Sequence, residues 1–422
     1  MTGGDAVDLA GAGEEADRLG VPLLVSEQGG TDPLQAELDR LGVTSVLTVG
    51  TPAGDWETLL DGLDHTSDPA ALPEFRAAGT PSNAVVLTEA GPAAAAVQAT
   101  ARAAGATVAE VPGGDPRADS RVIKLLHERS DAAVFGAGDA FGSEEIFAAR
   151  TAAARTGVEL PGGGQTVFPG RRLVALYGHP SGGSLGVLGE QGVGETIQRA
   201  RDTAAQYQPY SDEPVVPALE IIATVATADP GPDGTYSSAT EPADLEPWID
   251  AAEDAGVYVV LVLQPGRSTF LEQAKIYTDL LKRPGVGLAL DAEWRLAPGQ
   301  RHMEQIGSVD ASEINAVSDW LATLTRDLHL PQKTLLLHQF NSAMITNRGQ
   351  LDVGHDELAV SLHADGHGTA AEKLDTWNTL LTDLQPQIHP GWKNFYDEDS
   401  PTMTPEETFT GITPKPWFVS YQ

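Results

Sequence analysis

Two carboxyl groups with one small residue between them stand in the stretch Leu290-Asp291-Ala292-Glu293, directly after an apolar run. The run, residues 285–290, has the small and branched side chains typical of a buried parallel strand. Because side chains at positions i and i+2 of a strand point to the same face, Asp291 and Glu293 are expected to leave the strand end together. Charged groups in such a place are costly unless they are solvated, paired or used, so the pair marks a candidate site.

A close pair of carboxyl groups suits the acid/base cleavage of a glycosidic bond. That reaction needs a protonated acid for the leaving oxygen and a carboxylate for the positive charge that develops at the sugar carbon. Crowding and burial push two such pKa values apart, so one member keeps its proton near neutral pH. Trp294 would raise the pKa of Glu293 by excluding water and would stack on a sugar face, which makes Glu293 the predicted acid and Asp291 its charged partner. The structural alternative is a salt bridge of the pair to Arg295 or Arg267.

The elements that must position this pair form a regular alternation in the second part of the chain. Strands are expected at residues 173–177, 218–225, 258–263, 287–291, 334–339, 358–362, 393–396 and 417–421. Helices are expected at residues 194–207, 242–255, 269–282, 311–328, 370–384 and 405–409. This pattern predicts that residues 166–422 form one (β/α)8 TIM barrel, with its chemistry where the strands run into the following loops.

Further polar and aromatic side chains are expected at the same ends of the barrel strands. Packing does not explain such a concentration, so we predict that these residues join Trp294 in binding substrate. They are His338, Asn341, Asp365, Asp397, Trp417 and Tyr421.

The same strand ends leave a metal site open as an alternative. His338, His363, Asp365 and His367 are ligand types for zinc, which a metal-dependent barrel hydrolase would use. In the other interpretation these residues hydrogen-bond sugar hydroxyls or one another. We predict no metal and no other cofactor.

The first part of the chain, residues 1–165, has a different alternation. Strands are expected at residues 21–25, 45–50, 84–88, 108–111 and 132–136, with helices at 6–19, 34–41, 93–105 and 117–129. Helices of this length between strands predict a Rossmann-like parallel α/β module. The glycine-rich stretch at residues 161–164 marks the boundary between the two parts.

The composition limits the partners. There are 60 Asp and Glu residues against 26 Lys and Arg residues, a formal net charge of -34, which repels nucleic acid and anionic lipid. A neutral glycan or a basic partner suits this surface better, and solubility is the alternative reason for it. The chain has no cysteine, so disulfides and thiolate metal sites are excluded. We find no apolar run long enough for a membrane span.

Two stretches resemble known families. Leu19-Gly20-Val21-Pro22-Leu23-Leu24-Val25-Ser26, a helix, and Leu41-Gly42-Val43-Thr44-Ser45-Val46-Leu47-Thr48-Val49-Gly50 resemble the cell-wall-binding repeat 2 family, and residues 83–138 resemble a second copy. The D-x-E motif of Asp291 and Glu293 resembles the family 25 lysozymes, which cut peptidoglycan, and the family 18 chitinases. This resemblance also implies Glu293 as the acid and Asp291 as its partner.

Together these resemblances imply a secreted or cell-envelope-associated glycoside hydrolase. Its first module would bind the wall, and its barrel would cleave a wall polysaccharide or peptidoglycan. A non-catalytic wall-binding protein with a barrel that has lost its chemistry remains an alternative.

Overall fold

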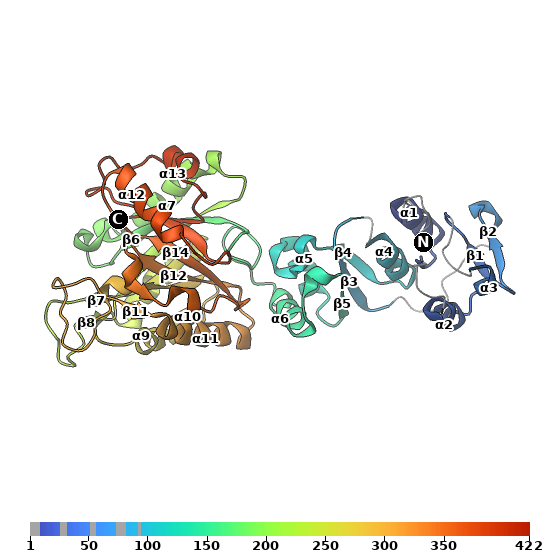
Figure 1. The fold of residues 1–422 in the computed structure, drawn as a ribbon, viewed down its shortest axis with the longest axis horizontal. Helices are drawn as coiled ribbons and strands as arrows, with labels where there is room; N and C mark the ends of the chain where they lie inside the picture. The colour runs from blue at the N-terminus through green and yellow to red at the C-terminus, as the bar shows by residue number, and fades with distance from the viewer. Residues whose placement is uncertain (1–8, 26–31, 51–55, 73–81, 92–93) are drawn as a thin grey trace. The chain divides into compact units, whose positions relative to one another are not determined.

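The structure is a computed structural model of the 422-residue chain (Figure 1). It describes residues 9–25, 32–50, 56–72, 82–91 and 94–422. The chain divides into two compact units, one of residues 1–116 and 121–155 and the other of residues 117–120 and 156–422. Among the described helices, none combines the length and the apolar character that a membrane crossing requires.

The second unit is a closed barrel of eight parallel strands, which confirms the predicted TIM barrel (Figure 1). In order around the barrel the strands are β6 (Arg172–Gly178), β7 (Val215–Ala226), β9 (Tyr258–Leu263), β10 (Val286–Asp291), β12 (Lys333–Gln339), β14 (Leu358–Ala364), β15 (His389–Asn394) and β16 (Phe418–Tyr421). The last strand pairs with the first, with Phe418 opposite Leu173, and so closes the ring. A short strand, β8 (Ser237–Ala239), pairs antiparallel with the end of β7.

Helices between the strands cover the barrel. They are α7 (Val193–Tyr207), α8 (Pro242–Asp254), α9 (Phe270–Ile276), α10 (Thr278–Leu281), α11 (Ala311–Asp327), α12 (Ala370–Leu381) and α13 (Pro405–Gly411). The crossover from β12 to β14 is described throughout and contains two 3₁₀ turns and the short strand β13 (Ile345–Thr346) instead of an α-helix. β13 pairs with another short strand, β11 (Val309–Asp310). The buried faces of the helices and the outward side chains of the strands form one large apolar core.

The interior of the barrel changes from apolar to polar along the strands. Toward the amino ends it is filled by Leu173, Ala175, Val216, Ala218, Tyr258, Val260, Leu336 and Phe418. Toward the carboxyl ends the buried inward positions hold Tyr177, Glu220, Asp291, His338, His363, Lys393 and Ser420. Pairing between neighbouring strands puts these polar residues at similar levels, since Asp291 lies opposite His338 and His338 lies opposite His363. This polar level is the base on which the candidate site is built.

Two predicted elements of the barrel need correction. The seventh strand, expected at residues 393–396, begins at His389, because Pro390 is tolerated near the start of a strand. The loop that follows therefore contains Tyr396 and Asp397. The single helix expected at residues 269–282 is two helices, α9 and α10, separated at Tyr277, whose buried hydroxyl donates to the carbonyl of Ala223 at 2.6 Å.

The described residues of the first unit form two small parallel sheets. One pairs β1 (Ser45–Leu47) with β2 (Asp64–Thr66), and the other has β3 (Ala84–Thr88) between β4 (Thr107–Glu110) and β5 (Ala133–Ala137). The helices are α1 (Leu9–Leu19), α2 (Asp32–Leu41), α3 (Trp56–Leu59), α4 (Ala95–Ala103), α5 (Ser120–Glu128) and α6 (Glu144–Arg155). Helix α6 was not predicted from the sequence. A single Rossmann-like sheet for this module stays a prediction.

The strand expected at residues 21–25 is not formed. The backbone of Leu23 instead exchanges two hydrogen bonds of 3.1 Å with the side chain of Thr100 on α4, so a helix side chain satisfies groups that a neighbouring strand would otherwise pair. Residues 6–8 and 93 of the predicted helices, and Ser26 of the repeat-like motif, lie outside the described residues.

Candidate active site

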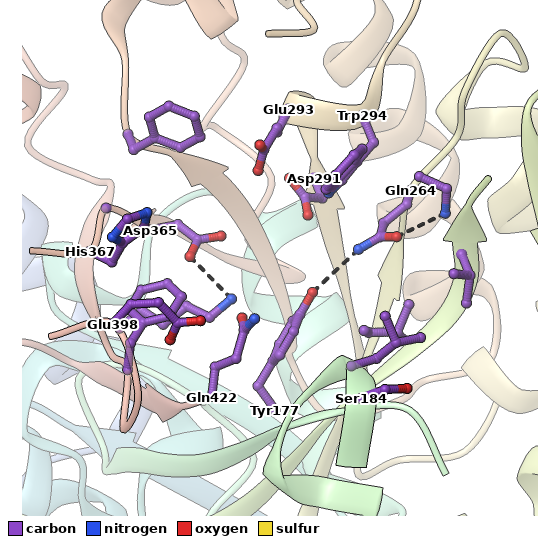
Figure 2. A pocket seen from close by; sticks show the side chains of 18 of the residues that line it. Tyr177, Ser184, Gln264, Asp291, Glu293, Trp294, Asp365, His367, Glu398 and Gln422 are labelled. Carbon is purple, nitrogen blue, oxygen red and sulfur yellow. Dashed lines mark hydrogen bonds and ion pairs between the residues drawn. The ribbon is translucent and has the colours of Figure 1, made fainter. Parts of the chain in front are cut away.

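A cavity of about 480 Å³ lies at the carboxyl ends of the barrel strands (Figure 2). This volume is within the usual range for a small-molecule site. Its carboxyl groups are those of Asp291, Glu293, Asp365 and Glu398, and its aromatic rings are those of Tyr177, Trp294, Phe340, Phe395 and His367. The one amine that lines it is that of Lys393. The cavity thus combines several acids with apolar faces.

Asp291 and Glu293 enter the cavity from different backbone conformations. Asp291 is the last residue of β10 and its side chain is almost entirely buried, with the residue 2% exposed. A 3₁₀ turn, Ala292–Trp294, then carries Glu293 and Trp294 to the rim. The turn, and not the expected strand alternation, brings the two carboxyl groups to one side of the cavity (Figure 2).

Burial raises the pKa of both carboxyl groups. The pKa of Asp291 rises from 3.8 to about 6, because desolvation and the charge of Asp365 outweigh the attraction of His338 and Lys393. The pKa of Glu293 rises from 4.5 to about 8, because desolvation is joined by the negative charges of Asp291 and Asp365. Near neutral pH, Glu293 is therefore mostly protonated and Asp291 mostly ionised.

The two arginines that would have given the pair a structural role are bound elsewhere. Arg295 forms an ion pair with Glu313 at 3.0 Å, and Arg267 donates to the carbonyl of Gln300 at 2.8 Å. Among the described residues, Asp291 Oδ1 is buried without a hydrogen-bond partner. The carboxyl pair is thus free to contact a ligand.

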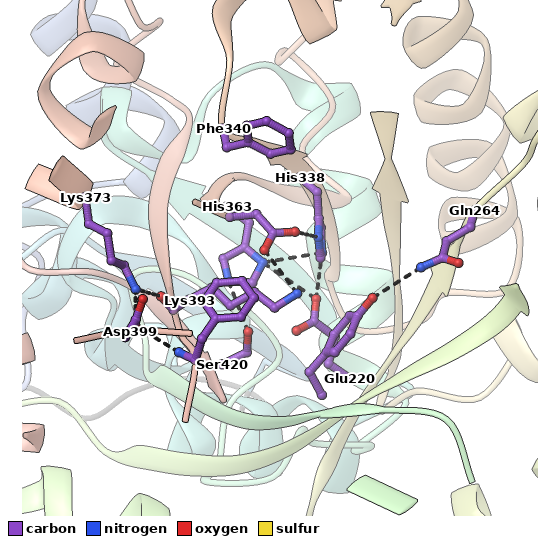
Figure 3. A network of polar contacts seen from close by, with 12 residues as sticks. Glu220, Gln264, His338, Phe340, His363, Lys373, Lys393, Asp399 and Ser420 are labelled. Carbon is purple, nitrogen blue, oxygen red and sulfur yellow. Dashed lines mark hydrogen bonds and ion pairs between the residues drawn. The ribbon is translucent and has the colours of Figure 1, made fainter. Parts of the chain in front are cut away.

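A chain of alternating charges, part of the polar network in Figure 3, ends at Asp365 and Lys393, which line the cavity. His338 Nε2 is 2.7 Å from Glu220 Oε1, and His338 Nδ1 is 2.8 Å from Asp365 Oδ2. Asp365 Oδ1 is 3.1 Å from the ammonium group of Lys393, which also lies 3.5 Å from the centre of the Tyr177 ring. The hydroxyl of Tyr177 accepts from Gln264 at 3.3 Å. Each of these buried charges thus has a partner of the opposite sign.

The pKa values in this chain follow from its pairing. Desolvation disfavours the imidazolium, but Glu220 and Asp365 raise the pKa of His338 to about 10. Desolvation also opposes ionisation of both carboxyl groups, yet His363 and His338 hold the pKa of Glu220 below its usual range, and Lys393 and His338 do the same for Asp365. Asp365 therefore presents a fixed negative charge to the cavity.

His363 completes the buried network and raises the question of a metal. Its Nδ1 lies 3.3 Å from His338 Nε2 and 3.6 Å from Glu220 Oε1, and its Nε2 lies 3.2 Å from the Ser420 hydroxyl. Ligand atoms of Glu220, His338 and His363 lie within 4.8 Å of one another, as do those of Asp291, His338 and Asp365. Either set has the nitrogen and oxygen donors of a zinc site. The 2.7 Å contact of Glu220 with His338 is a direct hydrogen bond.

The structure brings four of the predicted site residues into one cavity. They are Asp291, Glu293, Trp294 and Asp365. Trp294 packs edge-on against His302, with ring centroids 5.3 Å apart. The predicted substrate contact of His338 is corrected, since this side chain is fully buried under Asp365 and does not line the cavity.

Four further residues that are predicted to bind substrate do not line the cavity. Trp417 precedes β16 and so stands at the amino end of the strand, under the guanidinium of Arg172 at 4.1 Å. Tyr421 faces the helices because side chains alternate along the strand, and its hydroxyl lies 2.5 Å from that of Tyr207. The remaining two are loop residues: Asn341 accepts from the N–H of Ala343 at 2.9 Å, and Asp397 is exposed.

Three residues of the cavity and its network were not predicted as site residues, namely Glu220, Lys393 and Glu398. Glu220 and Lys393 are charged residues within otherwise buried strands. Charged side chains are rare in buried strands, so both could have been recognised from the sequence as candidate site residues. Glu398 stands in a run of acidic residues, and nothing in that run distinguishes the one that faces the cavity.

No protein-family model matches the chain, and a search of curated proteins finds no match. The fold and the site alone therefore define the class of this protein, which is a (β/α)8-barrel protein with an acidic cavity at the carboxyl ends of its strands.

Proposed function

We propose that the barrel is a glycoside hydrolase that cleaves a polysaccharide of the cell envelope by carboxylate acid/base catalysis. The observation that carries this proposal is the pair Asp291 and Glu293, which share one cavity and have pKa values of about 6 and about 8. A pair with one protonated and one ionised member near neutral pH is what glycosidic bond cleavage requires.

Each residue has a role in this mechanism. Glu293 donates its proton to the leaving oxygen as the glycosidic C–O bond breaks, and Asp291 stabilises the positive charge that develops at the sugar carbon. Water then adds to this carbon and returns a proton to Glu293. Trp294 supplies an apolar face for a sugar ring. The buried chain from Glu220 to Lys393 holds Asp365 ionised, and the charge of Asp365 helps to keep the proton on Glu293.

The envelope setting rests on the first unit. Its motifs at residues 19–26 and 41–50 resemble the cell-wall-binding repeat 2 family, which supports wall binding by a Rossmann-like module and a secreted or envelope-associated location. The partner is then a wall polysaccharide or peptidoglycan. The acidic charge of the chain, which disfavours nucleic acid, is consistent with this.

Release of reducing ends from wall polysaccharides and peptidoglycan tests the proposal. The wild-type protein should release them, and Glu293→Gln should lower kcat by about 100-fold or more with the fold intact, because the proton donor is lost. Glu246→Gln is the matched control, since Glu246 is exposed on α8. Equal activity of Glu293→Gln and the wild type excludes the acid role. Binding of glycan without any release favours the non-catalytic alternative.

A metal-dependent hydrolase is the second candidate. The convergence of donor atoms from Glu220, His338 and His363 favours it. Metal analysis of the purified protein, before and after treatment with a chelator, distinguishes the two mechanisms. Stoichiometric metal whose removal abolishes turnover would replace the carboxylate mechanism with this one.

A further inference from the structure

The charged groups that line the cavity do not balance. Four carboxyl groups line it, and because Glu293 mostly keeps its proton near neutral pH, the negative charge comes from Asp291, Asp365 and Glu398, against the single ammonium group of Lys393 and the imidazole of His367. Because the sugar-facing groups of a neutral glycan are hydroxyls and amides, a neutral ligand would leave this excess of acid uncompensated. The excess of negative charge in the cavity therefore bears on the charge of the ligand.

Lys393 does not offer a binding group for an acidic sugar. Its ammonium is held by Asp365 at 3.1 Å and by the face of Tyr177 at 3.5 Å from the ring centre. A substrate carboxylate would compete with Asp365 for this ammonium and would also approach Asp291. The cavity therefore disfavours sugars with a free carboxylate, such as uronic acids.

One acceptor in the cavity lacks a donor. Asp291 Oδ1 is buried and has no hydrogen-bond partner among the described residues, although Asp291 lines the cavity and the residue is only 2% exposed. A cationic donor would form a hydrogen bond with this buried carboxylate oxygen and would also offset its charge, which a neutral donor cannot do. In Figure 2, Asp291 and Glu293 reach into the cavity from one side and Asp365 and Glu398 from the other. A cationic group held between them would contact acids on both sides.

We propose that the cavity binds a glycan whose amino sugars carry free, positively charged amino groups. This inference rests on the proposed function, and it narrows the substrate to the amino polysaccharides that lack N-acetyl groups. Asp291 Oδ1 accepts a hydrogen bond from the ammonium group, and Glu398 adds a second negative charge at the exposed edge. Trp294 and Phe395 provide apolar faces for the rings.

Calorimetric titration of the Glu293→Gln protein tests this proposal, because the variant keeps the oligosaccharide intact during the measurement. The probes are hexamers of glucosamine, of galactosamine and of N-acetylglucosamine, each at low and at high NaCl concentration. We expect at least one amino hexamer to bind about tenfold more tightly than the acetylated one at low salt, and the difference to shrink at high salt.

The position of the charge is tested by a second substitution in the same background. Glu398→Gln should reduce the preference for the amino hexamer severalfold, whereas Glu246→Gln, which removes an equal charge from α8, should not. The proposal is overturned if the acetylated hexamer binds as tightly as both amino hexamers, if no amino hexamer binds, or if the two substitutions have equal effects.

Turnover separates this inference from the proposed function. If the wild type cleaves the acetylated polymer and not the amino polymers, the hydrolase proposal stands and the substrate class is wrong. If amino hexamers bind with the expected preference and no glycan is cleaved, the ligand class stands and the hydrolase proposal fails.

Discussion

Glu293 and Asp291 differ in their neighbours more than in their chemistry. Asp291 is the more deeply buried, yet its pKa rises only to about 6, because the nearby cations His338 and Lys393 favour its ionised form. Glu293 is only partly buried, yet its pKa rises to about 8, because the charges of Asp291 and Asp365 add to desolvation. The same residue types would have exchanged roles had the cations lain closer to Glu293.

The pH dependence of turnover should reveal this division. Activity requires ionised Asp291, so kcat/KM should fall as the pH drops below about 6. It also requires protonated Glu293, so kcat/KM should fall as the pH rises above about 8. Initial rates across this range check the prediction. A kcat/KM that stays constant from well below pH 6 to well above pH 8 would contradict it.

Glu220 is the charge on which the buried chain depends. Replacing Glu220 by Gln keeps the shape of the side chain and removes the carboxylate that pairs with His338 at 2.7 Å in the buried interior of the barrel. Removing one member of a buried ion pair costs about 3–5 kcal/mol of unfolding free energy. Urea titration of Glu220→Gln measures this loss.

The matched control for this substitution is Glu213→Gln. Glu213 pairs with Arg172 at 3.0 Å, but its side chain is 31% exposed. A partly exposed pair is worth about 0–1 kcal/mol, so the control should lose much less stability. Equal losses in the two variants would show that the buried network contributes no more than a surface pair.

At the scale of elements, three helices of the barrel begin with the same capping structure, which fixes the loop before each helix. α9, α12 and α13 each begin with a capping box, formed by the pairs Thr269 and Glu272, Thr369 and Glu372, and Thr404 and Glu407. In each, the threonine hydroxyl accepts from a backbone N–H and the glutamate accepts from the threonine backbone N–H. The start of α12 directly follows the loop of Asp365 and His367, so its cap fixes one wall of the cavity.

The cap of α12 can be tested by a single substitution. Thr369→Ala removes the hydroxyl that accepts from Glu372 N–H and should lower the unfolding free energy by about 1 kcal/mol. Thr379→Ala, at an exposed position in the same helix, should be neutral or slightly stabilising, because alanine has the higher helix propensity. Denaturant titration of both variants measures the two changes in unfolding free energy. A loss in Thr379→Ala as large as that in Thr369→Ala would refute the capping role.

At the scale of the whole molecule, the main electrostatic feature is the large negative net charge. A formal charge of -34 on 422 residues repels itself and opposes the compact state. The same charge attracts a polycation from solution, in agreement with the inferred substrate class. Both effects are electrostatic, and salt screens them.

The melting temperature should therefore depend on salt. At neutral pH, added NaCl should raise the melting temperature by a few degrees, about 2–4 °C for each kcal/mol of repulsion screened. Near pH 4.4, the isoelectric point, the net charge vanishes and the effect should disappear. Scanning calorimetry at the two pH values checks this. A salt effect of equal size at both would show that net repulsion is not its cause.

The sequence by itself determined the barrel and the placement of its central acid pair. The order of the eight strands and most helix limits follow from hydrophobic periodicity, which is a local property of the chain. Asp291 and Glu293 were placed at the carboxyl end of β10 for the same reason. The prediction of a strand at residues 21–25 was wrong, because the sequence does not show whether an apolar run will lie beside a partner strand.

Only the tertiary structure decided which other residues share the cavity. Tyr421 does not line the cavity because side chains alternate along β16. Trp417 does not line it because this residue precedes the start of β16, at the amino end of the strand. Glu220 and Lys393 joined the site through contacts with residues far away in the chain, such as His338, which lies 118 positions after Glu220. The register between strands and the closure of the ring bring such residues together, and neither can be inferred from the spacing of residues along one strand.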